Sequence, residues 1–138
     1  TITVEVKNML SWLLRVSLMF LLYGLALPAS HADSLDRFEL EELVYDKTAN
    51  CRKEKDQSLC TNYFSPEGVI VQVRDSGKRK DGRWFLDDSD RICILWNGKL
   101  KPMCFVVTEN EDGSYRMEKN GKLKSTILGL KDGNTENY

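Results

Sequence analysis

Four cysteines set the narrowest limits on the chemistry of this chain: Cys51, Cys60, Cys93 and Cys104. Eight residues separate the first two and ten separate the last two. These intervals are wider than the roughly two to four residues of a zinc knuckle, and the Cys-x-x-Cys pattern of redox enzymes is absent. An even number of cysteines is typical of disulfide-bonded exported domains. Proximity in the chain favours the pairs Cys51–Cys60 and Cys93–Cys104 among the pairings that four cysteines allow.

Histidine occurs only once, at His31, and cleavage of the leader described below would remove it. A mature chain without an imidazole cannot build a Ser-His-Asp site, a Cys-His site or a histidine metal site. Catalysis would then depend on carboxylates, as in a glycosidase whose two groups lie roughly 5–9.5 Å apart. The carboxylates at predicted turns are Glu67, Asp87, Asp88, Asp90 and Glu109. We expect a non-catalytic protein without a cofactor, and keep a carboxylate hydrolase as an alternative.

The acidic run from Asp87 to Asp90 is the candidate for a metal site. Carboxylates and backbone carbonyls are calcium ligands, but the glycine and distal glutamate of a calcium loop are missing. The sequence therefore favours a solvated turn, with no bound metal.

Basic residues gather at one predicted hairpin tip, formed by Lys78, Arg79 and Lys80 with Arg83 close behind. Such a tip could contact an anionic partner, for example a polysaccharide or a lipid head group. The alternative is a solubilising loop that protects a sheet edge.

Aromatic residues are the third group with binding potential. A curved sheet could gather them into a pocket for a small apolar ligand, although most would simply fill the core of so small a domain. Trp84 and Phe85 are neighbours on a predicted strand and must face opposite sides. The candidate pocket residues are Tyr63, Phe64, Trp84, Trp96, Phe105 and Tyr115.

Residues 1–32 have the pattern of a leader with a signal peptide. Arg15 precedes an apolar run from Val16 to Leu27, and Ser30 and Ala32 stand where signal peptidase reads small side chains. That run is shorter than the roughly 20 residues of a membrane span, so an uncleaved anchor is the weaker alternative. We expect cleavage near Ala32 and a periplasmic or secreted bacterial protein. Membrane attachment would come only through an uncleaved leader.

Cleavage would leave residues 33–130 as a single β-rich domain and residues 131–138 as a flexible tail. That mature chain has 18 lysines and arginines against 20 acidic residues, a net charge of −2. Its total charge makes no electrostatic case for binding nucleic acid or an anionic membrane.

Alternating apolar residues and turn signals from Asn62 to Leu128 predict about six short strands. Asn120-Gly121 is a strong signal for a tight hairpin. A four-residue loop from Asn97 to Leu100 would place Cys93 opposite Cys104. We expect a mainly β (α+β) fold, an antiparallel meander curled into a half-barrel or small barrel.

Two segments precede these strands. Residues 33–45 read as a short helix capped by Asp33 or Ser34, with Leu35, Phe38, Leu43 and Val44 as its apolar stripe. Residues 47–61 are polar, and we expect an exposed loop closed by the Cys51–Cys60 disulfide.

Several motifs in one order resemble a family of small exported bacterial proteins known only as a domain of unknown function. The motifs are Tyr63-Phe64-Ser65-Pro66-Glu67-Gly68, Gly82-Arg83-Trp84, Cys93, Trp96, Cys104-Phe105 and Gly113-Ser114-Tyr115. The resemblance covers about Asn62 to Leu128 and implies an exported, lipocalin-like β domain with a Cys93–Cys104 bridge. It implies no catalytic residues, and the Cys51–Cys60 pair is not part of its pattern.

The sequence therefore favours an exported domain that acts by binding a protein or another component of the cell envelope. A carrier of small apolar ligands and a carboxylate hydrolase are the alternatives.

Overall fold

The computed structural model describes residues 33–138, so the expected signal peptide lies outside the described residues. The described chain forms one helix, α2, and eight strands. Their bounds are α2 Arg37–Val44, β1 Lys47–Lys53, β2 Leu59–Phe64, β3 Val69–Arg74, β4 Arg79–Leu86, β5 Ile92–Trp96, β6 Met103–Glu109, β7 Tyr115–Lys119 and β8 Lys122–Asp132.

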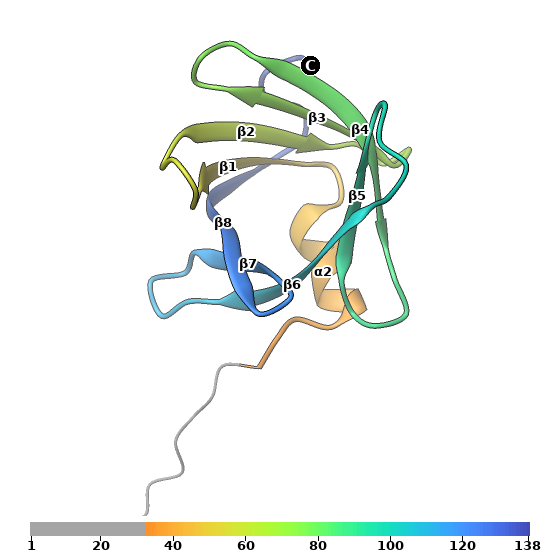
Figure 1. The fold of residues 1–138 in the computed structure, drawn as a ribbon, viewed down its shortest axis with the longest axis vertical. Coiled ribbons are helices and arrows are strands. Elements are labelled where there is room, and N and C mark those ends of the chain that lie inside the picture. Colours follow the sequence, from red (N-terminus) through yellow and green to blue (C-terminus); the bar gives the residue numbers. More distant parts are fainter. Residues whose placement is uncertain (1–32) are drawn as a thin grey trace, which may run out of the picture. The chain divides into compact units, whose positions relative to one another are not determined.

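The strands form a closed antiparallel barrel in which each strand pairs with the next and β8 pairs with β1 (Figure 1). The prediction of a mainly β, antiparallel meander barrel with one N-terminal helix is confirmed. Closure leaves no free sheet edge in the described chain, which removes the usual route to edge-to-edge aggregation.

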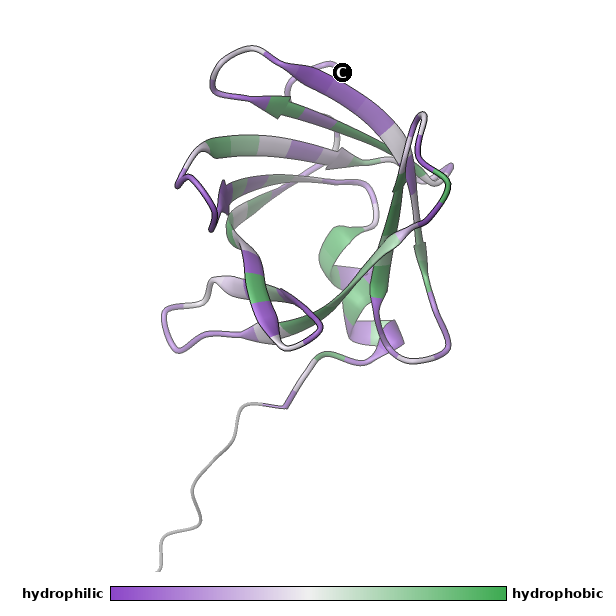
Figure 2. Cartoon of the chain, viewed as in Figure 1, coloured by the Kyte–Doolittle hydropathy of each residue, from purple (hydrophilic) through white to green (hydrophobic). Residues whose placement is uncertain are grey.

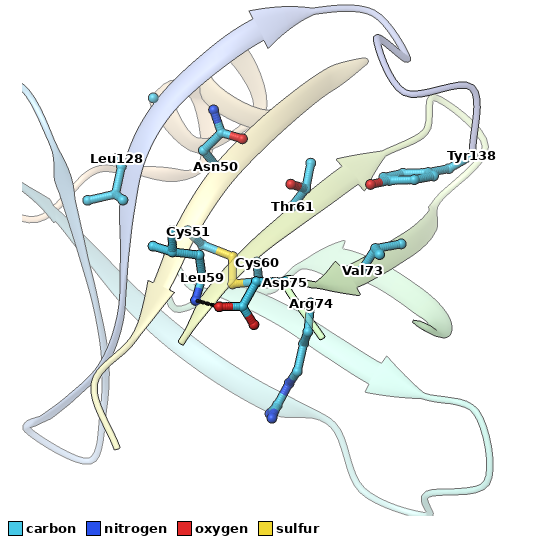
Figure 3. A pocket seen from close by; sticks show the side chains of 11 residues that line it. Asn50, Cys51, Leu59, Cys60, Thr61, Val73, Arg74, Asp75, Leu128 and Tyr138 are labelled. Atoms are coloured by element: carbon cyan, nitrogen blue, oxygen red, sulfur yellow. Dashed lines mark hydrogen bonds between the residues drawn. A yellow bond between two sulfur atoms is a disulfide. The ribbon is translucent and has the colours of Figure 1, made fainter. Parts of the chain in front are cut away.

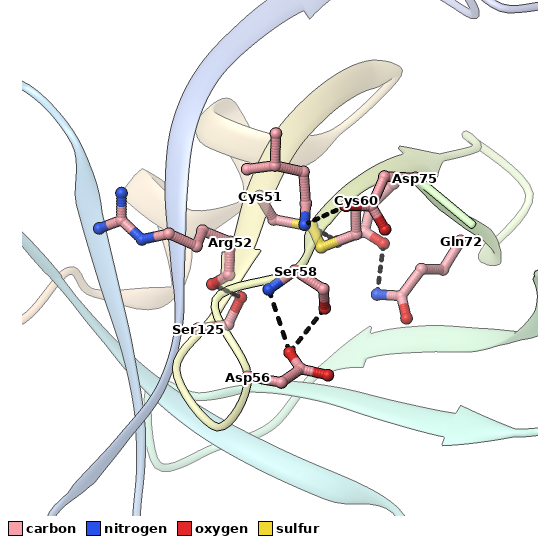
Figure 4. Close-up of a disulfide and its surroundings, with 10 residues drawn as sticks. Cys51, Arg52, Asp56, Ser58, Cys60, Gln72, Asp75 and Ser125 are labelled. Carbon is pink, nitrogen blue, oxygen red and sulfur yellow. Dashed lines mark hydrogen bonds between the residues drawn. A yellow bond between two sulfur atoms is a disulfide. The ribbon is translucent and has the colours of Figure 1, made fainter. Parts of the chain in front are cut away.

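The segment predicted as an exposed loop, residues 47–61, instead forms the β1–β2 hairpin. The sequence pattern does not indicate these strands, because Asn50, Arg52 and Lys53 interrupt the apolar side chains of β1. Cys51 lies opposite Cys60, and the disulfide between them is almost fully buried on the inner face (Figure 4). The tight turn is held by Asp56, whose carboxylate accepts hydrogen bonds from the backbone and hydroxyl of Ser58.

The second disulfide joins Cys93 of β5 to Cys104 of β6, directly opposite each other as predicted, although the connection between these strands comprises residues 97–102 rather than the predicted 97–100. All four cysteines are therefore paired, and the prediction of two disulfides is confirmed. Disulfides of this kind are typical of oxidising compartments outside the cytoplasm.

Helix α2 begins later than predicted, because the cap is Asp36 rather than Asp33 or Ser34. Asp36 and Glu39 form a reciprocal capping box, which satisfies two backbone N–H groups at the helix start. Leu40 and Val44 are fully buried among the strands, whereas Phe38, predicted to be on the apolar stripe, is 67% exposed.

Among the described residues no helix is long and apolar enough to cross a membrane.

The meander places successive turns at alternating ends of the barrel. We call the end that holds α2 the helix end; the β2–β3, β4–β5 and β6–β7 turns lie there. The β1–β2, β3–β4, β5–β6 and β7–β8 turns form the opposite end, which we call the open end. Hydrophilic turns and more hydrophobic strand segments are visible in Figure 2.

The β7–β8 hairpin turns at Asn120 and Gly121, both with positive φ, as the Asn-Gly pair predicts. Strand β8 runs beyond its predicted end to Asp132, because its last residues pair with β1. Beyond Asp132 the chain bonds to Thr48, whose hydroxyl donates to the carbonyl of Gly133 and accepts from the backbone of Thr135.

Gly82 permits a close contact between β4 and β5. It pairs with Trp96, and a Cβ atom at position 82 would lie 2.5 Å from the carbonyl oxygen of Leu95 and 3.1 Å from the Trp96 ring. Real Cβ atoms do not approach backbone this closely, so a larger residue must push the strands apart.

We expect Gly82→Ala to lower the free energy of unfolding by about 1–3 kcal/mol, the usual cost of overpacking. Gly129→Ala is the matched control, because a Cβ at position 129 has no neighbour within 4 Å. Urea denaturation of both variants tests this. Equal unfolding midpoints for the two would contradict the proposed close contact.

The two disulfides should contribute comparably to stability. Each closes a short hairpin loop, which corresponds to about 2–3 kcal/mol in the chain-entropy estimate. Since the Cys51–Cys60 bridge is buried in the barrel, we expect its double serine variant to lose at least as much as the Cys93/Cys104 double serine variant. Guanidinium denaturation compares the two, and a wild-type midpoint for the Cys51/Cys60 variant would refute this expectation.

Candidate functional site: the open end of the barrel

Charge is strongly segregated between the two ends. The open end, comprising residues 53–58, 74–80, 97–102 and 118–124, carries eleven basic and four acidic side chains, a net charge of +7. The helix end, comprising residues 36–46, 65–68, 87–91 and 109–114, carries two basic and twelve acidic side chains, a net charge of −10. A nearly neutral total charge thus conceals two highly charged surfaces. The argument against anionic partners from total charge does not apply to the open end.

A row of polar side chains crosses the inner face of the barrel next to this end. Asn62, Gln72 and Lys80 are register partners on β2, β3 and β4. The Gln72 amide nitrogen donates to the Asn62 side-chain oxygen at 2.8 Å, and Asn62 in turn contacts the sulfur of Cys51. Gln72 is only 2% exposed, and its Oε1 atom has no hydrogen-bond partner in the described part of the chain.

Arg74 lies two residues beyond Gln72 on the same face of β3, and therefore also points inward. Its Nε atom is buried and has no hydrogen-bond partner among residues 33–138. The guanidinium approaches Asp56 at 4.0 Å. This long contact is the ion pair that the structure records for Arg74.

Lys53 completes the inner group from the end of β1. Burial lowers the pKa of Lys53 to about 8, with further contributions from the positive charges of Lys80 and Arg74. Burial also lowers the pKa of Lys80, together with the charges of Arg74, Lys78 and Lys99. Neither Lys53 nor Lys80 forms an ion pair with any of the described residues.

A cavity of about 590 Å³ opens at this end of the barrel. We call it the mouth cavity; it is lined by Lys80, Trp96, Gly98, Lys99, Leu100, Lys101 and Met103. The Lys80 ammonium lies 4.4 Å from the centre of the Trp96 ring, a cation–π contact. Leu100 is 98% exposed between two lysines.

The residues of the predicted basic hairpin do not act as one patch. Lys78 is exposed in the β3–β4 turn, and Arg79 faces outward and pairs with Asp81 at 3.1 Å. Lys80 faces inward. Arg83 lies three residues further along β4, opposite Val69, and so about 10 Å from Lys80 along the strand.

The aromatic residues predicted to line an apolar pocket fall into two groups. Phe64, Trp96 and Phe105 belong to the buried core, with Trp84 and Tyr115 packed against it. Trp84 meets Phe64 edge to face and donates its indole N–H to the carbonyl of Ser65. Tyr63 faces outward; burial and its hydrogen bond to Asp46 raise the pKa of Tyr63 to about 12.

The acidic turn at residues 87–90 uses its carboxylates to hold local structure. Asp87 accepts hydrogen bonds from Ser89 and Arg91, and Asp88 pairs with the Arg37 side chain at 3.0 Å. Asp90 accepts from the backbone N–H of Arg37 at 2.8 Å, which joins the turn to the start of α2. Asp87 also lies within 4.8 Å of both sulfurs of the Cys93–Cys104 disulfide, but sulfurs in a disulfide are not thiolate ligands.

A second cavity, of about 470 Å³, lies outside the barrel across β8, β1, β2 and β3. Outward-facing Asn50, Thr61 and Val73 form its floor, and Leu59 and Leu128 flank it. Figure 3 shows Tyr138 of the C-terminal segment reaching back beside Thr61 and Val73. Its lining carries little net charge, in contrast to the open end.

Sequence reasoning missed Lys53, Asn62, Gln72 and Arg74. The sequence of β3 contains a sign of two of these residues, because Gln72 and Arg74 alternate in step with Ile70 and so lie on the same face of the strand. Val69, Val71 and Val73 make the opposite face the more apolar one, yet Ile70, Gln72 and Arg74 are the residues that point into the barrel.

Comparison with family models, with curated proteins and with solved structures found no match to this chain. The structure by itself shows a small antiparallel β-barrel with two disulfides. The resemblance of the chain to a family of exported domains stays a prediction.

Repulsion among the three cations that face into the barrel, Lys53, Arg74 and Lys80, should lower the free energy of unfolding. We expect Lys53→Met to raise the urea midpoint in phosphate-free buffer at pH 7, because it removes a buried cation and keeps the side-chain volume. Lys55→Met, in the exposed β1–β2 turn, is the control and should change the midpoint little. A lower midpoint for Lys53→Met would show that the charge stabilises the fold.

Proposed function

We propose that this protein is an exported, non-catalytic domain whose open end binds an anionic membrane surface of the cell envelope. The observation that carries the proposal is the excess of eleven basic over four acidic side chains at that end, seven of the basic ones being exposed. Each basic residue near an anionic bilayer contributes about 1 kcal/mol of attraction, so several together give appreciable binding. The acidic helix end would be repelled, which orients the molecule.

Leu100 favours a lipid surface over a hydrated polysaccharide. It stands at the tip of the β5–β6 turn, fully exposed, with Lys99 and Lys101 on either side. An apolar side chain between two cations can enter the boundary between head groups and acyl chains while the lysines meet the phosphates. A polysaccharide would leave the leucine in water.

The other two candidate functions draw less support from the geometry. Phe64, Trp96 and Phe105, three of the residues expected to line an apolar pocket, belong to the cluster of buried core side chains inside the barrel. At the acidic turn the carboxylates of Asp87, Asp88 and Asp90 are engaged by Arg37 and Arg91.

Co-sedimentation of the oxidised protein with vesicles tests the proposal. We expect binding to vesicles that contain phosphatidylglycerol, none to pure phosphatidylcholine, and release as salt is raised from 0.05 M to 0.5 M. Leu100→Asp should weaken binding at least about tenfold, because it replaces an exposed leucine that would enter the bilayer by a carboxylate that the anionic lipids repel.

Phe38→Asp is the matched control, since Phe38 is an exposed apolar residue at the helix end. It should leave vesicle binding unchanged. Equal binding to both kinds of vesicle, or equal losses for Leu100→Asp and Phe38→Asp, would refute the proposed function.

A further inference from the structure

The inner cations of the open end form a group distinct from the exposed rim. Lys53, Arg74 and Lys80 come from three strands and all face into the barrel. They lie close enough for Lys80 and Arg74 to act electrostatically on Lys53. Beside them lies the hydrogen-bonded pair of Gln72 and Asn62.

We propose that Lys53, Arg74, Lys80 and Gln72 form a binding site for a phosphate group that enters through the mouth cavity. The inference rests on the proposed function for the natural source of that phosphate, which is a lipid head group that ends in a phosphate monoester, because a phosphodiester has no proton to donate to Gln72. The site itself does not depend on a membrane, so free inorganic phosphate should occupy it.

Charge balance is the first argument. Among residues 33–138, the carboxylate recorded beside these three cations is that of Asp56, which is 4.0 Å from Arg74. Holding unmatched charges of one sign in a partly buried place is unfavourable unless a counter-charge is bound. Phosphate near neutral pH carries between one and two negative charges, which is the size of the excess.

Hydrogen-bonding capacity is the second argument. Arg74 Nε is a buried donor without a partner, and Gln72 Oε1 is a buried acceptor without a partner. A protonated phosphate supplies both complements, because its oxygens accept from the guanidinium and its hydroxyl donates to the amide oxygen. Sulfate at neutral pH has no proton to donate, so it can satisfy Arg74 but not Gln72.

Access is the third argument. The mouth cavity of about 590 Å³ is lined by Lys80 together with Trp96 and the exposed rim residues Lys99 and Lys101. A ligand that enters there would meet the ammonium of Lys80 first, and Gln72 is the register partner of Lys80 on β3. The cation–π contact with Trp96 holds the Lys80 ammonium at that cavity. A phosphate group is far smaller than the cavity.

The decisive pair of variants is Lys80→Gln and Arg79→Gln. The two residues are neighbours on β4, remove the same charge and face opposite sides of the sheet. We expect wild-type protein to bind inorganic phosphate in calorimetry at pH 7, with sodium chloride keeping ionic strength constant. Lys80→Gln should weaken binding at least about tenfold, and Arg79→Gln less than about twofold.

Sulfate and pH give two further readouts. Sulfate should bind more weakly than phosphate, and Gln72→Glu should abolish binding of both by placing a negative charge among the cations.

Phosphate affinity should fall between pH 7.5 and 9.5, because Lys53 loses its proton in this range. The charged groups around Lys53 are Lys80 on β4, Arg74 on β3 and Asp56 in the β1–β2 turn. Lys53→Gln should remove most of that pH dependence.

Absence of phosphate binding by the wild type, or equal losses for Lys80→Gln and Arg79→Gln, would overturn the inference. Thermal melts of each variant without phosphate identify any that fail to fold. The vesicle assay separates this result from the proposed function. Vesicle binding without phosphate binding would refute only the inner site, whereas phosphate binding without vesicle binding would refute only the membrane partner.

Discussion

Pairing of β1 with β8 is the interaction on which the rest of this structure depends. It joins the first and last strands of the described chain through a long register from Lys47–Asp132 to Lys53–Ser125, with a bulge between Asn50 and Cys51. Closure turns a meander into a barrel with an inside and two ends. Every distinction between inner and outer face, and between open end and helix end, follows from it.

Closure also explains how a chain of small net charge presents two opposite surfaces. A meander sends alternate turns to alternate ends, so charges that alternate from turn to turn along the sequence separate in space. The basic turns beginning at Asp75, Asn97 and Asn120 share one end, and the acidic turns at Asp87 and Glu109 share the other with α2. Total charge averages over this arrangement and therefore misleads.

The sequence predicted what depends on local pattern and missed what depends on closure. The strands between Asn62 and Leu128, the Asn120-Gly121 turn and the facing cysteines Cys93 and Cys104 have local signals. Strand β1 has a weak local signal, because Asn50, Arg52 and Lys53 interrupt its apolar residues, and its pairing with β8 is set by closure of the barrel. The inner site was missed for the same reason. Lys80 was recognised as basic, but its position inside the barrel follows from the pairing of β3 and β4 in a closed sheet.

The placement of the two disulfides has a consequence for how the chain folds. Each joins strands that are adjacent in sequence, with separations of 9 and 11 residues, so each can form within one hairpin. Hairpins of this length assemble within microseconds, long before thiols oxidise. The pairing of β1 with β8 has the highest sequence separation and no covalent bond across it. Its formation therefore has the largest entropic cost of loop closure. The two disulfides can thus form on separate hairpins. The short separation between the cysteines of each pair favours the native pairing. Closure of the barrel remains reversible after both disulfides have formed.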